Sequence, residues 1–597
     1  MPEPLGESRA EAACVGLGPM QQLPTNDEIA RQFELLADLL EVEGADAFRV
    51  VAYRRASQRM RESAASIAQL ALDGRAKELA GIGSTIQDKI VQIVDDGEIK
   101  ALTDRRARIP EDVVRFMRLP GLGPKTAARI WRELGVTTLD ELRAAAEEQR
   151  LRALRGMGAR TEERVLKSLA ELRDTAPEEM RTLLGRALGP LLAVVSVLRE
   201  HPAADLVSEA GSVRRRRETV RDLDIIATAS DPAALTEYFT KLTWVVEIAA
   251  HGDSKATVVS NEGLRFDLRV VPPESFGNLL QHFTGSKHHN VALREEAVRR
   301  GLSVSEYGIE DVESGEVMRT RDEAEVYDRL GYQFIPPELR ENAGELEAAR
   351  RGELPQLVEL GDLRGDLHAH STWSADGHHT IEQLALLCVE RGYEYVTVTD
   401  HSHHLREGRL ERQWEEIETL NRRLAPFRLV RGVEVNIRAD GTLDMTDDEL
   451  AGCDWVVASL HTAFDREPTE RMIAAMENPN VDVIGHPSAR KLNRRRGADL
   501  DLDRVIAKAV ETGTFLEINS QPDRLDLRDT HARAAGEAGV KIAVSSDGHR
   551  PRELPNVEFG VAQARRAWLT RDQVVNTRSW RELEKLRKPE RARAAQS

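Results

Sequence analysis

Three aspartates stand where they could share divalent cations in this chain of 597 residues. Asp222 and Asp224 lie two apart in the run DLDII, residues 222–226, which predicts a strand with one buried face. The period of two puts both carboxylates on the same face of that strand. A second alternating run, residues 265–271, carries Asp267 on its polar face. Two cations about 3.5–4 Å apart are the usual device for in-line displacement at phosphorus, so the aspartates predict phosphoryl transfer with Mg²⁺ or Mn²⁺.

A turn able to hold phosphate precedes the aspartates, where residues 211–217 read GSVRRRR. The Gly-Ser pair offers backbone N–H groups and a hydroxyl, and arginine pairs with phosphate through two parallel hydrogen bonds. A single D-x-D pattern is more often a solvated strand end than a metal site. The third aspartate and the phosphate-binding turn favour the metal site here.

With the downstream run HFTGSKHHN, residues 282–290, these motifs resemble the X family of DNA polymerases, to which polymerase beta belongs. The patterns GS…R…DxD, RxDxR and FTGS…N occur at matching spacings. The resemblance implies an α+β nucleotidyltransferase palm in which Asp222, Asp224 and Asp267 form the metal triad, with dNTPs and gapped or nicked double-stranded DNA as substrates. It further implies that the incoming nucleotide is bound by Gly211, Ser212, Arg215, His282, Phe283, Gly285, Asn290 and Arg294.

Two residues depart from the family pattern. Arg221 precedes the first aspartate where the family usually has glycine, and His282 stands where polymerase beta has a tyrosine beside the sugar. Neither departure removes a catalytic group, so they bear on nucleotide affinity and ribose discrimination. In the same motif, we expect His288 and His289 to face DNA.

A second set of metal-binding residue types recurs from Asp366 onward. Most of these residues follow a short apolar run, as in YVTVTDH, WVVASLH, VDVIGHP and KIAVSSDGH, and helical stretches lie between the runs. Such repetition puts the ligands at the carboxyl ends of parallel barrel strands. Imidazoles and carboxylates gathered in this way suit Zn²⁺ or Mn²⁺.

This second pattern resembles the PHP domain, an α/β distorted (β/α)7 barrel that holds about three metal ions. All the ligand positions of that family carry residues able to bind metal, so we expect an active phosphoesterase in which hydroxide attacks phosphorus. The resemblance implies nine ligands: His368, His370, Asp376, His401, Glu434, His461, His486, Asp547 and His549. Four further histidines match no ligand position and are interpreted as surface or substrate-contacting residues: His378, His379, His403 and His404.

The N-terminal part reads as helices separated by three Gly-x-Gly turns. The turns open at Leu79, Leu119 and Leu154, which are 40 and 35 residues apart, and each leads into a helix with Lys or Arg. Turns of this kind direct N–H groups outward and suit a phosphodiester. They resemble helix-hairpin-helix motifs, which hold DNA without reading its sequence; ordinary glycine-capped turns are the alternative. The DNA-binding glycines would be Gly81, Gly83, Gly121, Gly123, Gly156 and Gly158.

Lys89 lies eight residues after Gly81, on the helix that leaves the first hairpin. In polymerase beta the corresponding lysine is the Schiff-base nucleophile that removes a deoxyribose phosphate. Such a lysine needs a lowered pKa, which a neighbouring cation such as Lys77 could supply. The family's second lysine, four residues earlier, is Thr85 here. A lysine that only contacts DNA would give the same pattern, so lyase activity and a DNA contact both stay open.

The composition fits a soluble protein in a reducing compartment. No apolar run approaches 18 residues, there is no signal pattern, and the three cysteines, Cys14, Cys388 and Cys453, form no C-x-x-C pair. The formal net charge of −17 argues against a nucleic-acid partner, but residues 75–173 hold 20 Lys and Arg against 16 Asp and Glu, a surplus of +4. We therefore expect a cytoplasmic, nucleoid-associated monomer without a membrane segment.

Together the motifs predict a multidomain chain with an all-α helix-hairpin-helix N-terminal region, a palm and a barrel. Thr25 or Asn26 is expected to cap the first helix. The expected boundaries are 1–24 for a disordered extension, 25–100 for a polymerase beta-like helical domain with the first hairpin, 101–175 for a DNA-binding helix-hairpin-helix subdomain, 176–275 for the palm, 276–335 for a nucleotide-binding subdomain, 336–362 for a linker and 363–587 for the PHP domain.

The chain thus resembles a bacterial-type family X DNA polymerase with a fused PHP domain. We expect it to fill short gaps in base-excision repair and to trim 3′ ends as a 3′–5′ exonuclease or 3′-end phosphoesterase. One alternative is a phosphoesterase or 3′-phosphatase whose polymerase half mainly binds DNA, because Arg221 hinders the triphosphate. Another is a non-enzymatic scaffold for DNA ends, and the complete sets of acids and ligands count against it.

Overall fold

The computed structural model describes residues 23–588 except 25, 62–66, 80, 118, 120, 121, 155, 156, 173–180 and 496. Most of the expected extension 1–24, the helix-cap candidate Thr25, and the predicted DNA-binding glycines Gly121 and Gly156 lie outside the described residues. The chain divides into two compact units. The first comprises residues 1–179 with 238–251 and 256–265, and the second comprises the rest.

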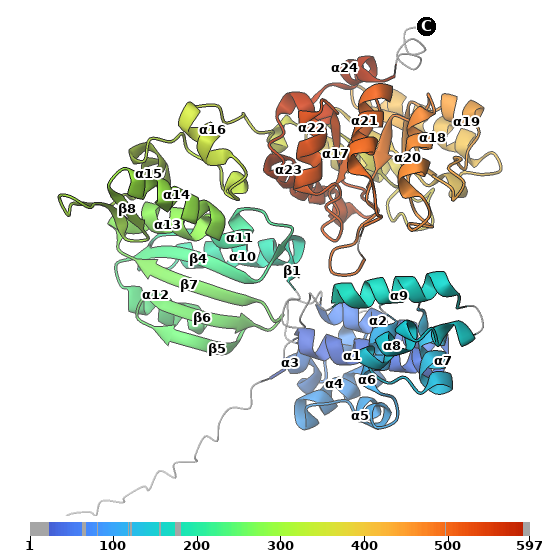
Figure 1. The fold of residues 1–597 in the computed structure, drawn as a ribbon, viewed down its shortest axis with the longest axis horizontal. Helices are drawn as coiled ribbons and strands as arrows, with labels where there is room; N and C mark the ends of the chain where they lie inside the picture. The colour runs from blue at the N-terminus through green and yellow to red at the C-terminus, as the bar shows by residue number, and fades with distance from the viewer. Residues whose placement is uncertain are drawn as a thin grey trace, which may run out of the picture. The chain divides into compact units, whose positions relative to one another are not determined.

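The N-terminal part of the first unit is built from helices, as the sequence predicts (Figure 1). Its apolar side chains, such as Phe33, Leu36 and Leu40 at helical spacing, form one buried core. Asn26, the other cap candidate, is the first residue of α1, and its Oδ1 accepts a hydrogen bond of 2.8 Å from the backbone N–H of Ile67. The helices are α1 Asn26–Glu43, α2 Ala47–Arg61, α3 Ile67–Leu72, α4 Ser84–Asp96, α5 Lys100–Arg106, α6 Glu111–Phe116, α7 Pro124–Leu134, α8 Leu139–Glu147 and α9 Ala159–Leu172.

The three hairpin turns share one hydrogen-bond pattern. In each, the residue between the two glycines donates its N–H to the carbonyl of the leucine that opens the turn, over 3.0 Å in all three. The donors are Ile82, Leu122 and Met157. The second glycine of each turn is followed at once by α4, α7 or α9. Each turn therefore presents the N-terminus of a helix, where unpaired N–H groups attract phosphate.

The second unit begins with part of a mixed α/β domain. Strand β4 (Asp222–Ala229) lies between β2 (Ala204–Glu209) and β7 (Arg265–Val271), and it is antiparallel to β2. Along β4, Leu223 and Ile225 are buried while Asp222 and Asp224 are half-buried, which confirms the predicted alternation. The remaining elements of this region are β1 Thr182–Leu183, α10 Leu184–Arg199, α11 Gly211–Arg214, β3 Thr219–Val220 and α12 Pro232–Thr240. The strands β5 Val245–Gly252 and β6 Lys255–Ser260 complete the strand order, and most of their residues belong to the first unit.

A smaller helical lobe follows, with a short sheet in the order β10–β9–β8. Its core continues into the stretch expected as a linker, since Leu339, Leu346 and Ala349 are buried in the same cluster as Tyr327. This part of the linker is therefore packed against the lobe. The elements are α13 Phe276–Thr284, α14 Lys287–Arg299, β8 Leu302–Ser305, β9 Gly308–Asp311, β10 Val317–Met318, α15 Glu323–Arg329 and α16 Glu345–Arg351.

The C-terminal part is a nearly closed barrel of seven parallel strands in sequence order, confirming the predicted fold (Figure 1). A parallel bridge between Ala369 and Gly548 joins the ends of the first and last strands. The strands are near-continuous apolar runs because the barrel interior and the outer helices bury both faces. They are β11 Gly365–Ala369, β12 Tyr395–Val398, β13 Arg428–Asn436, β14 Trp455–Ser459, β15 Val483–Gly485, β16 Phe515–Asn519 and β17 Ile542–Ser545.

Helices connect the barrel strands in the predicted alternation. They are α17 Ile381–Glu390, α18 Arg409–Leu424, α19 Asp447–Ala451, α20 Pro468–Glu477, α21 Leu502–Thr512, α22 Asp529–Glu537, α23 Val557–Arg566 and the terminal α24 Trp580–Leu583. In the part of the chain that the structure describes, no helix combines the length and apolar content needed to cross a bilayer.

Candidate metal centre and nucleotide site

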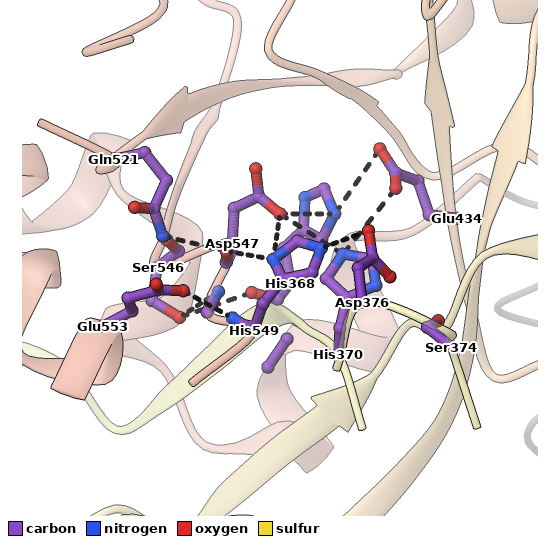
Figure 2. Close-up of polar contacts among 12 residues, drawn as sticks. His368, His370, Ser374, Asp376, Glu434, Gln521, Ser546, Asp547, His549 and Glu553 are labelled. Atoms are coloured by element: carbon purple, nitrogen blue, oxygen red, sulfur yellow. Dashed lines mark hydrogen bonds and ion pairs between the residues drawn. The ribbon is translucent and has the colours of Figure 1, made fainter. Parts of the chain in front are cut away.

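All nine predicted metal ligands gather at the carboxyl ends of the barrel strands. His368 and Glu434 lie within β11 and β13, and the other seven follow the ends of β11, β12, β14, β15 and β17. Figure 2 labels six of them, His368, His370, Asp376, Glu434, Asp547 and His549, converging on one region. The topology brings together residues that are almost 180 positions apart in the sequence.

The ligands form three overlapping groups, each with its ligand atoms within 4.8 Å of one another. The groups are His370, His401 and His549; His368, His370 and Asp547; and His401, Glu434 and His461. The other two predicted ligands border them: Asp376 Oδ2 lies 3.4 Å from His401 Nε2, and His486 Nε2 lies 3.1 Å from Glu434 Oε1. Each of the three overlapping groups could hold a metal ion.

Glu434 is the central acid of this cluster. Its Oε2 lies 2.7 Å from Nδ1 of His401, and its Oε1 lies 3.3 Å from Nε2 of His461. Burial would raise the pKa of Glu434, but the surrounding imidazoles outweigh burial and hold the pKa well below its usual range. The carboxylate is therefore ionised and can bridge cations.

The donor atoms fit bound metal ions. Among the described residues, Nε2 of His368 and both ring nitrogens of His370 are buried without a hydrogen-bond partner, an arrangement that is costly unless something binds them. Burial and the neighbouring His549 and His401 hold the pKa of His370 well below its usual value. The neutral imidazole is the form that binds metal. The mixture of imidazole and carboxylate donors suits Zn²⁺ or Mn²⁺.

Strand β16 supplies a buried acid that sequence reasoning missed. Glu517 Oε1 lies 2.8 Å from Nδ1 of His368, and its Oε2 accepts the backbone N–H of His486 at 2.7 Å. Asn436 has a similar role toward His461, whose Nδ1 lies 2.6 Å from the amide oxygen. The signal in the sequence was the run FLEIN, which follows the same strand pattern as the ligand-bearing segments.

The backbone around the ligands is held in sparsely populated conformations. His486 and Asp547 have φ values of +30° and +49°, and such strain clusters at functional sites. Gln521 Nε2 donates to the carbonyls of Ser546 and Asp547 at 2.8 and 2.9 Å, which holds this strained turn in place (Figure 2).

The four extra histidines do not share one environment. His378 and His403 are exposed, and His404 Nδ1 accepts the N–H of Ala375 at 3.2 Å. The interpretation of His379 as a surface residue is wrong, since its side chain is fully buried; a contact with substrate stays a prediction. The local run DGHHT gives both adjacent histidines the same sequence context, so the pattern could not separate them.

The three predicted catalytic aspartates of the central sheet lie close together. Asp222 and Asp224 share one face of β4, and Asp267 lies on the adjacent β7. Burial, together with the charges of Asp267 and Asp222, raises the pKa of Asp224 to about 6. Carboxylates that lie close enough to raise one another's pKa are a feature of sites that bind divalent cations.

Gly211 allows the predicted phosphate-binding turn to approach these acids. Its φ is +64°, and a Cβ atom there would lie 2.0 Å from Oδ2 of Asp224. Any other residue would push this carboxylate away. Ser212 follows in α11 and is half-buried.

The arginines of the same turn are engaged in ion pairs. Arg214 pairs with both carboxylate oxygens of Glu323 at 2.8 Å. Arg215, predicted to contact the triphosphate, donates Nε to Glu341 Oε1 at 3.0 Å and Nη1 to the carbonyl of Thr284 at 2.8 Å. The charges of Arg269 and Arg215 partly offset the rise in the pKa of Asp224, so Arg215 lies near the acids.

An arginine of the barrel joins this network. Arg566, on α23, donates Nη1 to the carbonyl of Arg215 at 2.9 Å and to Glu341 Oε1 at 3.1 Å. Its Nη2 bonds Asp529 at 2.5 Å, and only 3% of its side chain is exposed. The glutamate that holds Arg215 is therefore itself held by the barrel.

The predicted nucleotide-pocket residues surround the turn between α13 and α14. Asn290 Nδ2 donates to the carbonyls of His282 and Gly285 at 2.7 and 3.3 Å, and a Cβ on Gly285 would meet Asn290 Oδ1 at 2.4 Å. Arg294 Nη2 lies 3.4 Å from His282 Nδ1. Phe283 lies under Arg269 of β7, with 4.5 Å between the guanidinium carbon and the ring centre. The structure thus places this group at the edge of the acid site.

His289 was expected to face DNA, and this expectation is wrong. Its ring is fully buried, with Nδ1 2.7 Å from Glu345 Oε1 and Nε2 3.1 Å from the Tyr327 hydroxyl. His288, its neighbour, is exposed, and its contact with DNA stays a prediction.

Lys89 lies on α4, half-buried, on the helix that leaves the first hairpin. The backbone N–H of Lys77 donates to Gln87 Oε1 at 3.0 Å, so the segment with Lys77 is tied to the helix that carries Lys89.

Four family models match separate parts of the chain in the predicted order. A helix-hairpin-helix domain matches residues 24–99, a SAM-like helix-hairpin-helix tandem 113–171, the DNA polymerase beta thumb 279–341 and the PHP domain 366–521.

Curated proteins are similar to nearly the whole chain or to parts of it. The "DNA polymerase/3′-5′ exonuclease PolX" of Bacillus subtilis is 37% identical over 568 residues, which are 93% of this chain and 98% of that protein. A probable phosphatase of Thermoanaerobacter sp. is 30% identical over 225 residues, 36% of this chain and 89% of that protein. DNA polymerase lambda of Rattus norvegicus is 24% identical over 370 residues, 57% of this chain and 60% of that protein. The first similarity extends over nearly the whole chain, the other two over parts of it.

Proposed function

The chain belongs to the PolX family of DNA polymerases with 3′–5′ exonuclease activity, and we propose that it fills short gaps in DNA at the aspartates and trims 3′ ends in the barrel. The observation that carries this proposal is the presence of two sets of metal-binding side chains that share no residue. The three aspartates lie on the adjacent strands β4 and β7, and the nine predicted barrel ligands lie within or just after the strands of the parallel barrel.

At the polymerase site, the chain's own residues position the substrates. The Gly211-Ser212 turn is close enough to Asp224 for a triphosphate bound there to reach the acids. Arg215 would exchange Glu341 for a phosphate oxygen when a dNTP binds. Divalent cations, when bound, supply Lewis acidity toward the phosphoryl oxygens at both sites. We propose Mg²⁺ or Mn²⁺ at the aspartates and about three Mn²⁺ or Zn²⁺ ions in the barrel.

In the barrel, buried carboxylates hold the imidazoles in fixed orientations, and the low pKa of His370 keeps it unprotonated. The site therefore exists before a DNA end enters it, which lowers the reorganisation that hydrolysis needs. The two sites act on the same 3′ end of a DNA strand, where one adds a nucleotide and the other removes one. This combination suits DNA repair.

Finer assignments stay proposals. They are the domain boundaries 25–100, 101–175, 176–275, 276–335, 336–362 and 363–587, dNTPs as substrates, a monomeric state, and a cytoplasmic, nucleoid-associated location. Lys89 as a lyase nucleophile is also a proposal. Helix-hairpin-helix elements at residues 24–99 and 113–171 support DNA binding without sequence readout.

The decisive experiment measures both activities on a 5′-phosphorylated, one-nucleotide-gapped duplex with and without dNTP, in Mg²⁺ and then in Mn²⁺. Asp222→Ala or Asp267→Ala should abolish nucleotide addition and leave 3′-end removal intact. His370→Ala or Asp547→Ala should do the reverse and lower the bound metal.

Loss of both activities in a folded single variant would contradict two independent sites. Absence of nucleotide addition by the unaltered protein would favour the alternative, a phosphoesterase whose polymerase half binds DNA.

A further inference from the structure

Arg524 lies beside the barrel metal ligands without a role in holding them. Its Nε is 3.9 Å from Oδ2 of Asp547, and 15% of its side chain is exposed. Asp547 turns its other oxygen, Oδ1, toward His370 at 3.3 Å. The guanidinium therefore lies on the opposite side of this ligand, at the edge of the metal cluster.

The guanidinium of Arg524 has a single polar side-chain contact among the described residues, the ion pair with Asp547 at 3.9 Å. It donates no hydrogen bond there, and Asp547 is the one acid within reach. Asp547 Oδ2 already accepts Nδ2 of Asn519 at 2.9 Å. A guanidinium has five N–H donors, and one acid at 3.9 Å leaves most of them available to a ligand. Arginine in such a position is suited to a planar, two-oxygen anion.

Two further cations stand near Arg524. Burial and then the charge of Arg524 lower the pKa of Lys491, and the same two causes lower the pKa of Arg495. Lys491 pairs with Asp523 at 2.7 Å, and Arg495 lies over the ring of Phe464 at 4.2 Å. Three cations thus lie on this side of the metal cluster together with Asp523 and Asp526, and of these cations Arg524 is the one in contact with a predicted metal ligand.

We propose that Arg524 binds the nonbridging oxygens of the scissile phosphodiester and is a further catalytic residue of 3′-end removal. The inference rests on the proposed phosphoesterase function of the barrel. Hydrolysis joins a water oxygen to phosphorus and releases the 3′ oxygen of the shortened strand, which takes up a proton. Negative charge gathers on the nonbridging oxygens as the new bond forms, so a guanidinium beside them stabilises the transition state.

The test compares Arg524→Gln with Arg528→Gln, which removes an exposed arginine from the same segment. Rates are measured with a 5′-labelled oligonucleotide, metal content by elemental analysis, and gap filling on the same preparations. Arg524→Gln should lower kcat/KM for 3′-end removal about 100-fold, as removal of one oxyanion donor does in other enzymes. Metal content and gap filling should not change, and Arg528→Gln should match the unaltered protein.

Two further measurements separate a phosphate contact from a structural role. Guanidinium chloride at millimolar, non-denaturing concentration should restore part of the activity of Arg524→Ala. Inorganic phosphate should bind the metal-loaded unaltered protein about tenfold more tightly than Arg524→Gln in calorimetry. The phosphate-binding measurement does not depend on exonuclease turnover, so it tests the role of Arg524 even if the unaltered protein removes no 3′ ends. Absence of 3′-end removal by the unaltered protein would refute the proposed function and not the role of Arg524. Unchanged phosphate affinity, or loss of metal in Arg524→Gln, would overturn the assignment of Arg524.

Discussion

Nδ1 of His368 lies 2.8 Å from Oε1 of Glu517, and both side chains are fully buried at the bottom of the barrel metal cluster. The contact leaves Nε2 of His368 directed at the ligands Glu434 and Asp547, at 3.6 and 3.7 Å. A carboxylate that bonds one ring nitrogen fixes the ring orientation and makes the other nitrogen a better ligand. Glu517 thus orients the metal ligand His368 and is not counted among the ligands itself.

Glu517→Gln and Glu517→Ala should therefore weaken metal binding in the barrel by about 10- to 100-fold, with Ala the stronger effect. The amide can still bond His368, whereas alanine leaves both His368 and the N–H of His486 without an acceptor. Metal retained after dialysis against a graded chelator measures the change. Glu511→Ala, an exposed acid on α21, is the control. Equal retention in all variants would show that Glu517 does not support the ligands.

Arg566→Ala should raise KM for dNTP about tenfold while 3′-end removal persists. Without Arg566, Glu341 loses one of its two hydrogen-bonded cations and pairs more strongly with Arg215. Glu341 then competes with the triphosphate for Arg215. Steady-state gap filling at varied dNTP measures KM, and Arg391→Ala, an exposed arginine of the barrel, is the control. A parallel decrease of both activities would instead indicate damage to the fold.

The Mg²⁺ requirement of gap filling should depend on pH through Asp224. The pKa of Asp224 is about 6, above the ordinary value of 3.8. In the metal-free protein, protonation of Asp224 therefore stabilises the fold fully below pH 3.8, and this contribution is lost as the pH rises through about 6. Bound Mg²⁺ competes with that proton. Half-maximal gap filling should therefore need about tenfold more Mg²⁺ at pH 5 than at pH 7. DNA affinity measured at both pH values serves as the control, and an unchanged Mg²⁺ requirement would contradict the raised pKa.

Lys89→Ala should remove the covalent adduct that borohydride traps between the protein and an incised abasic site. It should leave gap filling intact, because the acids lie in a different part of the chain. Gel analysis of the adduct measures the effect, and Lys100→Ala, an exposed lysine on α5, is the control. An adduct that survives in Lys89→Ala would move the nucleophile elsewhere, with Lys77 the next candidate. Absence of an adduct in the unaltered protein would leave the first hairpin as a DNA grip alone.

The local sequence was sufficient for the elements that carry the chemistry. The alternation around Asp222 and Asp224 predicted β4, and the repeated apolar runs predicted a parallel barrel with metal-binding residues at its strand ends. The seven strands and the set of nine ligands came from the resemblance to the PHP domain. Both inferences succeed because side-chain direction in a strand has a period of two and parallel strands end on one edge. The hairpin turns were likewise predictable, since glycine spacing and turn geometry are local.

Partners distant in the sequence were decided only by the tertiary structure. His289 and exposed His288 are identical and adjacent in the sequence, and His289 is buried because Glu345 and Tyr327 come to its ring. In the sequence, Glu517 is indistinguishable from any other acid within an apolar strand. The structure shows its role, because β16 pairs with β15, the strand that leads to His486. Residue type and spacing determine which side chains can bind metal or phosphate. The burial and the charge of those side chains depend on which distant segments pack against them. Local spacing in the sequence does not determine that packing.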